Sequence, residues 1–87
     1  MENIATVFNQ GLFALKSGDL VSAEKIFRSV VQKDKSNVAA LNLLAVILMN
    51  RKEFSEAENF ISRAISIDRS SDVSFYNYGI ISKQLNK

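Results

Sequence analysis

The side chains in this sequence that could do chemistry are two pairs of glutamates, Glu24 with Glu58 and Glu53 with Glu56. Two carboxylates that face each other can divide the roles of general acid and general base. These four side chains, however, are expected on exposed helix faces or turns beside basic residues, where solvent surrounds the charge. The chain has no histidine and no cysteine, which often transfer protons or attack substrates in enzymes. We therefore predict no catalytic residue and no enzyme activity in this chain.

Metal ligands and cofactor-binding motifs are also missing from the sequence. Without cysteine there is no disulfide bond and no thiolate metal site, and without histidine a zinc site would need carboxylates alone, which is rare. No stretch resembles a glycine-rich phosphate-binding loop. We therefore predict no metal and no cofactor.

The charge and hydropathy of the chain argue against nucleic acids and membranes as partners. The formal net charge is only +2, and the eleven lysines and arginines form no run longer than two residues, whereas a nucleic-acid platform requires clustered charge. The longest apolar stretch, residues 43–49, is far shorter than the about 20 residues that span a bilayer. The first residues lack the pattern of a secretion signal. We expect a soluble, cytoplasmic chain, in agreement with the absence of cysteine.

The most informative pattern in the sequence is a repeat with a period of 34 residues. Residues 22–27 (SAEKIF) return as residues 56–61 (EAENFI), and residues 34–36 (DKS) return as residues 68–70 (DRS). A period of this length is typical of one supersecondary unit that stacks on copies of itself. In such a stack most apolar residues pack between units, so a binding function must lie on the surface that the stack presents.

Apolar residues recur at helical spacing in five segments: 4–17, 20–34, 37–50, 54–68 and a fifth that runs from Ser70 or Ser71 to Leu85. Asp19 and Ser36 precede the second and third segments as candidate N-caps, and Gly18 can end the first. No segment alternates apolar and polar residues long enough to predict a strand. We predict an all-α fold of two helical hairpins followed by a fifth helix.

These residues resemble the tetratricopeptide repeat family, whose unit is a helix–turn–helix with small residues where the two helices approach most closely. The matching residues are Gly11, Gly18, Leu20, Ala23, Phe27 and Asp34 in the first repeat, Leu41, Leu44, Ala45, Phe54, Ala57, Ala64 and Asp68 in the second, and Phe75, Asn77, Tyr78 and Gly79 in the third. The chain departs from the family's pattern at Lys35 and Arg69, where proline is usual, and at Lys52, where glycine is usual.

The resemblance implies a right-handed superhelical array within a single domain, residues 1–87. It consists of repeats 4–37 and 38–71 and a partial repeat 72–87, whose one helix either caps the array or belongs to a truncated unit. Small residues occupy equivalent places on the first helix of each unit (Gly11, Ala45, Gly79) and on the second (Ala23, Ala57). Side chains of this size let helix backbones approach each other.

The resemblance also implies that the first helix of each unit lines a concave face that binds a protein partner. The predicted partner-binding residues on this face are Phe8, Leu12, Leu15, Lys16, Asn42, Val46, Met49, Asn50, Tyr76, Ile80 and Lys83. Gln84 joins the polar residues at the rim, and the apolar members are not expected to be needed by the core. An apolar groove with a polar rim is typical of sites for an amphipathic helix or an apolar peptide. We therefore predict a protein–protein interaction module.

Two other functions also fit the sequence. The apolar groove could meet a second copy of the chain or a neighbouring segment of the same polypeptide, which is an architectural role. The chain could instead recruit substrates within a larger protein, such as a glycosyltransferase with these repeats. Asn9, Leu43 and Asn77 occupy the same position in successive repeats. In the superhelical repeat arm of O-linked sugar transferases, asparagines at that position form a row that binds the backbone of a peptide. The third repeat stops at residues 86–87, so we expect a piece of a longer chain or an end that another copy covers.

Overall fold

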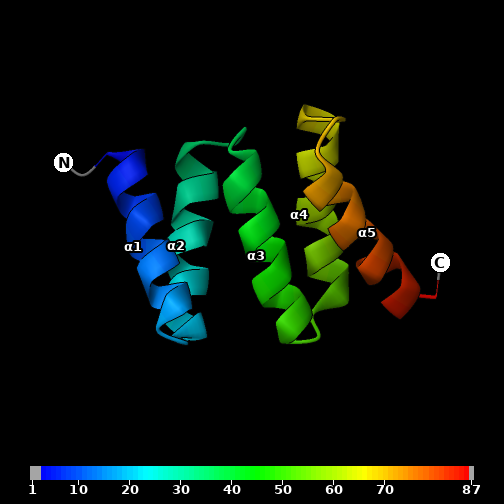
Figure 1. Cartoon of the computed structure of the whole chain (residues 1–87), viewed down its shortest axis with the longest axis horizontal. Helices are drawn as coiled ribbons and strands as arrows, with labels where there is room; N and C mark the ends of the chain where they lie inside the picture. The colour runs from blue at the N-terminus through cyan, green and yellow to red at the C-terminus, as the bar shows by residue number, and fades with distance from the viewer. Residues whose placement is uncertain (1–2, 87) are drawn as a thin grey trace.

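The computed structural model describes residues 3–86 and contains five α-helices (Figure 1). They are α1 (Ile4–Lys16), α2 (Leu20–Lys33), α3 (Val38–Asn50), α4 (Phe54–Ile67) and α5 (Asp72–Gln84). Each helix matches a predicted segment with ends that differ by no more than two residues, and residues 3–86 contain no strand. The predicted all-α class is therefore confirmed. Met1, Glu2 and Lys87, which the predicted domain includes, lie outside the described residues.

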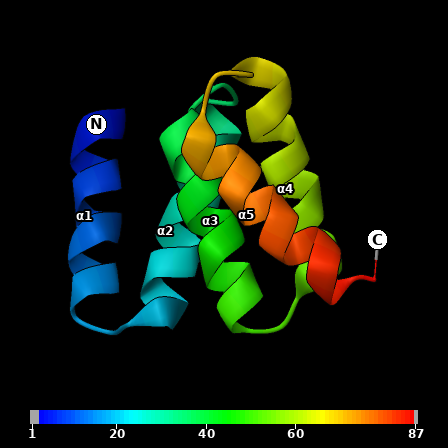
Figure 2. The same ribbon diagram turned by 45° about the vertical axis from the view of Figure 1, so that its right-hand side comes forward.

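The helices stack in chain order along the longest dimension of the molecule. α1 packs on α2 and α3 packs on α4, so the first four helices form two helical hairpins. α2 packs on α3 and joins the hairpins, while α5 packs on both α3 and α4. Figure 1 shows α5 in front of α4 at the end of the stack, and Figure 2 shows α5 crossing in front of α3 beside α4. The chain extends 42 Å along its long axis and only 18 Å along its short axis, as expected for a unit repeated in one direction.

The helices that open each unit begin at cap residues that follow the 34-residue period. The side chains of Asn3, Asn37 and Ser71 each accept a hydrogen bond from the backbone N–H three residues later, at 2.8, 3.0 and 3.2 Å. Asp19 caps α2 in the same way, as predicted. The prediction of Ser36 as the cap of α3 is wrong by one residue, because only the residue directly before the helix can reach the free N–H groups of its first turn.

The turns that follow α1, α3 and α5 repeat in backbone conformation as well. Gly18, Lys52 and Asn86 are spaced by 34 residues, and all three have left-handed backbones, with φ of 79°, 63° and 62°. Glycine adopts this conformation freely and asparagine tolerates it. At a lysine the Cβ atom crowds the following carbonyl oxygen, which costs about 1 kcal/mol. Lys52, a departure from the glycine of the family's pattern, therefore holds a strained turn.

Replacing Lys52 with glycine is expected to raise the free energy of unfolding by about 0.5 to 1 kcal/mol. The relief of backbone strain stabilises the folded state, and the greater freedom of glycine in the unfolded chain offsets only part of this gain. The same change at Lys25, an exposed residue inside α2, should instead lower it by about 1 kcal/mol. Urea unfolding followed by far-UV circular dichroism measures both. A Lys52→Gly variant no more stable than the wild type would show that the turn is unstrained.

Small residues allow the close approach of α1 to α2. Ala23 and Ala57 are fully buried, as their equivalent positions predict, and Gly11 is buried against the ring of Phe27. A Cβ atom at Gly11 would lie 2.7 Å from Phe27 Cζ, so a larger residue does not fit without displacing the ring. Gly79 differs, because a Cβ placed there has, apart from the nearby residues of its own helix backbone, no described atom within 4 Å.

Candidate functional site

Three hollows open between α1, α3 and α5, and they form the candidate functional site. Each hollow is lined by residues from at least two of these helices, and none of the lining side chains is charged. By contrast, two hollows contain arginines, lysines and a glutamate: one is lined mainly by α2 and α4, and the other by α2 and the turn before α4. The surface of α1, α3 and α5 therefore suits an apolar ligand, and the surface of α2 and α4 suits an ionic one.

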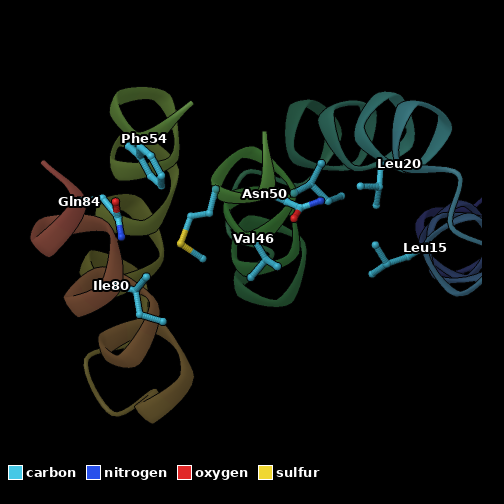
Figure 3. Close-up of a pocket in the computed structure, with 9 residues that line it drawn as sticks. Leu15, Leu20, Val46, Asn50, Phe54, Ile80 and Gln84 are labelled. Atoms are coloured by element: carbon cyan, nitrogen blue, oxygen red, sulfur yellow. The ribbon is translucent and has the colours of Figure 1, made fainter. Parts of the chain in front are cut away.

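The hollow at the C-terminal ends of α1 and α3, which we call the C-terminal hollow, gathers the most predicted residues. It has a volume of about 420 Å³ and is lined by Leu15, Leu20, Val46, Ile47, Met49, Asn50, Phe54, Ile80 and Gln84. Figure 3 shows Val46 and Asn50 in the middle, between side chains of α4 and α5 and side chains of α1 and α2. The structure thus brings together, around one hollow, Leu15, Val46, Met49, Asn50, Ile80 and the rim residue Gln84.

Sequence reasoning missed three members of the C-terminal hollow, namely Leu20, Ile47 and Phe54. Leu20 and Phe54 each open the second helix of a hairpin and are 34 residues apart. The sequence identified both only as matches to the family's pattern, yet both are half-buried and contribute to the hollow. Their shared place at the start of a hairpin's second helix was the signal that could have identified them.

Two further hollows lie at the N-terminal ends of α1, α3 and α5. The first N-terminal hollow measures about 480 Å³ and is lined by Ile4, Ala5, Phe8, Asn9, Asn37 and Ala39. The second measures about 370 Å³ and is lined by Val38, Ala39, Asn42, Leu43, Ser71 and Val73. Each residue of the second hollow lies 34 positions after a residue of the first. The sequence repeat therefore reappears as a repeat of the surface, not only of the core.

Phe8 belongs to the core as well as to the first N-terminal hollow. Its ring packs edge-to-face on the ring of Phe27, with 5.4 Å between the centroids and 70° between the planes. Leu12, Leu15 and Met49 are also half-buried against the core. The expectation that the core does not need these four groove residues is wrong, because a side chain at the edge of a helix interface touches both the neighbouring helix and the open surface.

Asn42 lies within the contact of α3 with α5, and only 6% of the residue is exposed. Its amide nitrogen donates to the Val38 carbonyl oxygen at 3.1 Å and to Ser74 Oγ at 2.8 Å, while its amide oxygen accepts from Asn77 at 3.3 Å. Asn42 as a partner-binding residue stays a prediction: it lines the second N-terminal hollow, but α3 and α5 already satisfy the polar atoms of its amide. The amide of Asn77 also points inward, so it does not form an open peptide-binding ladder with Asn9.

The remaining predicted residues are open to solvent. Tyr76 on α5 is 71% exposed, which is unusual for so large an apolar ring. Lys16 and Lys83 are exposed near the C-terminal ends of α1 and α5 and line none of the three hollows. Apolar, amide and hydroxyl groups therefore form the hollows, and the two lysines lie outside them.

An ionic network joins the hairpins on the side of α2 and α4. Arg28 donates from Nε to Glu24 at 3.0 Å, and its two terminal nitrogens contact the two carboxylate oxygens of Glu56 at 2.9 and 2.8 Å. Arg51 pairs with Glu24 as well. Two arginines thus neutralise two glutamates and connect α2 to α4 and to the turn before it.

The network changes the ionisation of its carboxyl groups. Burial raises the pKa of Glu24, but hydrogen bonds from Arg28 and Arg51 outweigh it, so the pKa lies below its ordinary value of 4.5. The hydrogen bond from Arg28 likewise lowers the pKa of Glu56. The expectation of solvated glutamates is wrong for Glu24, whose side chain is only 14% exposed. Carboxylates held ionised by arginines are poorly suited to act as general acids near neutral pH.

Comparison with known proteins tests the family resemblance. The model of the tetratricopeptide repeat family matches residues 14–74, well over half of the chain, from the end of α1 to the start of α5. No curated protein matches the chain. None of the helices within residues 3–86 has the length and apolar character that a membrane span requires. Because the match covers α2, α3 and α4 completely and well over half of the chain, the chain belongs to the tetratricopeptide repeat family.

Proposed function

We propose that the chain is an interaction module that binds an apolar peptide or an amphipathic helix of a protein partner in the hollows between α1, α3 and α5. Tetratricopeptide repeats are generally protein–protein interaction modules. The observation that carries the proposal is the series of three hollows without a charged lining residue on one surface. Such hollows suit apolar side chains of a ligand. The absence of cysteine fits an interaction in the reducing cytoplasm.

The C-terminal hollow offers complementary kinds of contact. The flexible thioether of Met49 adapts to the shape of an apolar side chain, whereas Ile80 is stiff. The amides of Asn50 and Gln84 both donate and accept, so each can pair with the main chain of a peptide. Tyr76 precedes Ile80 by one helical turn and adds a large exposed ring.

The proposal is tested by selecting short random peptides displayed on phage against the immobilised chain. We expect peptides rich in large apolar residues, with dissociation constants of about 1 to 100 µM, typical of short apolar ligands. Val46→Asp should weaken the selected peptides about tenfold or more, because the change places a carboxylate in the C-terminal hollow. Isothermal titration calorimetry measures the affinities.

The matched control is Val21→Asp, the same change at an exposed valine on α2 that lines none of the three hollows. This variant should bind the selected peptides as the wild type does. An equal loss of affinity in both variants, or undiminished binding to Val46→Asp, would contradict the proposal.

Self-association is a second candidate, favoured by the exposure of Phe13. This residue is 73% exposed on α1, whereas its counterparts one and two periods later, Ile47 and Ile81, are 1% and 0% exposed inside the stack. Another copy could cover Phe13 in the same manner. Sedimentation velocity at several concentrations distinguishes the candidates: a dimer that Phe13→Asp abolishes supports end-to-end association. A dimer lost on changing Tyr76 and Ile80 to aspartate supports association through the hollows.

A further inference from the structure

A cationic cleft lies on the side of the molecule formed by α2 and α4. It has a volume of about 470 Å³ and is lined by Arg28, Val31, Gln32, Lys35, Phe60 and Arg63. Three of these six side chains are basic and none is acidic. The lining residues are distinct from those of the three hollows between α1, α3 and α5.

The three basic side chains of the cleft differ in how far their charge is already neutralised. Arg28 belongs to the ionic network, where Glu24 and Glu56 neutralise it. Neither Lys35 nor Arg63 forms an ion pair among residues 3–86. The cleft therefore presents two uncompensated positive charges, both on exposed side chains.

Phe60 holds the arginines of the cleft in place. The guanidinium carbon of Arg63 lies 5.5 Å from the centre of the Phe60 ring, and that of Arg28 lies 5.8 Å from it. Cation–π contacts at such distances restrict a long side chain before any ligand arrives. Arg63 can therefore bind a carboxylate with less loss of conformational freedom than an unrestrained surface arginine.

We propose that this cleft is a second binding site, for an acidic peptide segment of a protein partner. A glutamate or aspartate of the segment accepts hydrogen bonds from the planar guanidinium of Arg63, and Lys35 attracts a second carboxylate. Val31 and Phe60 offer apolar contact between these charges. The charges favour a peptide over a nucleic acid, because duplex binding usually needs several phosphate contacts and the cleft has only two uncompensated cations.

The test is fluorescence anisotropy of a fluorescein-labelled hexaglutamate peptide titrated with the full chain at low ionic strength. We expect saturable binding that weakens as salt is added. Arg63→Gln should weaken the binding about tenfold, because the variant loses a charge-assisted hydrogen bond to the peptide and a loss of that kind corresponds to about this change in affinity. Arg69→Gln removes an equal charge from the exposed turn between α4 and α5 and should leave the affinity unchanged. Urea unfolding confirms that both variants fold.

Further arms of the experiment separate this site from the proposed peptide site and from general attraction to polyanions. Val46→Asp should bind hexaglutamate as the wild type does. Failure of the apolar peptides to bind in the hollows therefore does not affect the proposal for the cationic cleft, and failure of hexaglutamate to bind does not affect the proposal for the hollows. The inference is overturned by three outcomes: the absence of saturable binding, an equal loss in Arg63→Gln and Arg69→Gln, or a single-stranded DNA oligonucleotide that binds more tightly than hexaglutamate with the same dependence on Arg63.

Discussion

Replacing Phe27 with alanine is expected to lower the free energy of unfolding by about 3 to 5 kcal/mol. The ring is fully buried, packs on the ring of Phe8 and fills the space next to Gly11. Alanine leaves a cavity that α1 and α2 cannot close completely, because several buried residues hold the hairpin in place. A domain of this length is usually stable by about 4 to 13 kcal/mol, so the variant loses much of its stability. The midpoint of urea unfolding measures the effect.

The matched control for this prediction is Phe13→Ala. Phe13 is 73% exposed, so removing its ring should change the free energy of unfolding by less than about 0.5 kcal/mol. The same substitution at two phenylalanines of one hairpin thus compares the loss of stability at a buried position with that at an exposed one. Equal shifts of the urea midpoint in the two variants would contradict the described packing of the first hairpin.

Gly11→Ala is expected to lower the free energy of unfolding by about 2 kcal/mol. The new Cβ atom would lie 2.7 Å from Phe27 Cζ and 2.9 Å from Phe27 Cε1, and the fully buried ring has little room to move. Overpacking of this kind costs about 3 kcal/mol, of which the better helix propensity of alanine returns about 1 kcal/mol. The same urea experiment measures the change.

Gly79→Ala is the counterpart of this change on α5, two periods later in the sequence. A Cβ atom there meets nothing within 4 Å, so only the helix propensity counts and stability should rise by about 0.5 to 1 kcal/mol. The two equivalent glycines should therefore respond with opposite signs. A Gly11→Ala variant as stable as the wild type would disprove the close approach of α1 to α2.

The helices and their order could be predicted because local signals and the repeat agree. Asp19 caps α2, and Gly18 carries the left-handed backbone of the turn between α1 and α2. Ala23 and Ala57 mark the closest contacts between helices. Each of these features can be recognised from a few neighbouring residues or from the equivalent residue 34 positions away in the sequence. Errors at this level were small: the cap of α3 is Asn37, next to the predicted Ser36.

The site could be predicted only in part, because side-chain environments depend on contacts between units. Asn42 is one period after Phe8, but α5 covers it and bonds its amide. No local pattern distinguishes that position from an open one. Arg28 and Glu56 are likewise far apart in the chain, so the sequence indicated solvated charges where the structure contains an ionic network.

The uncharged hollows between α1, α3 and α5 are the basis of the proposed function, and the position of a bound peptide tests them most directly. The measurement is a map of amide chemical-shift changes in the nitrogen-15-labelled chain as a peptide from the selection is added. We predict the largest changes at residues 46–50 of α3 and 80–84 of α5, with little change at residues 28–33 of α2, none of which lines any of the three hollows. Changes confined to residues 28–35 and 60–63, which include the lining of the cationic cleft, would contradict the assignment of the peptide to the hollows if binding is intact.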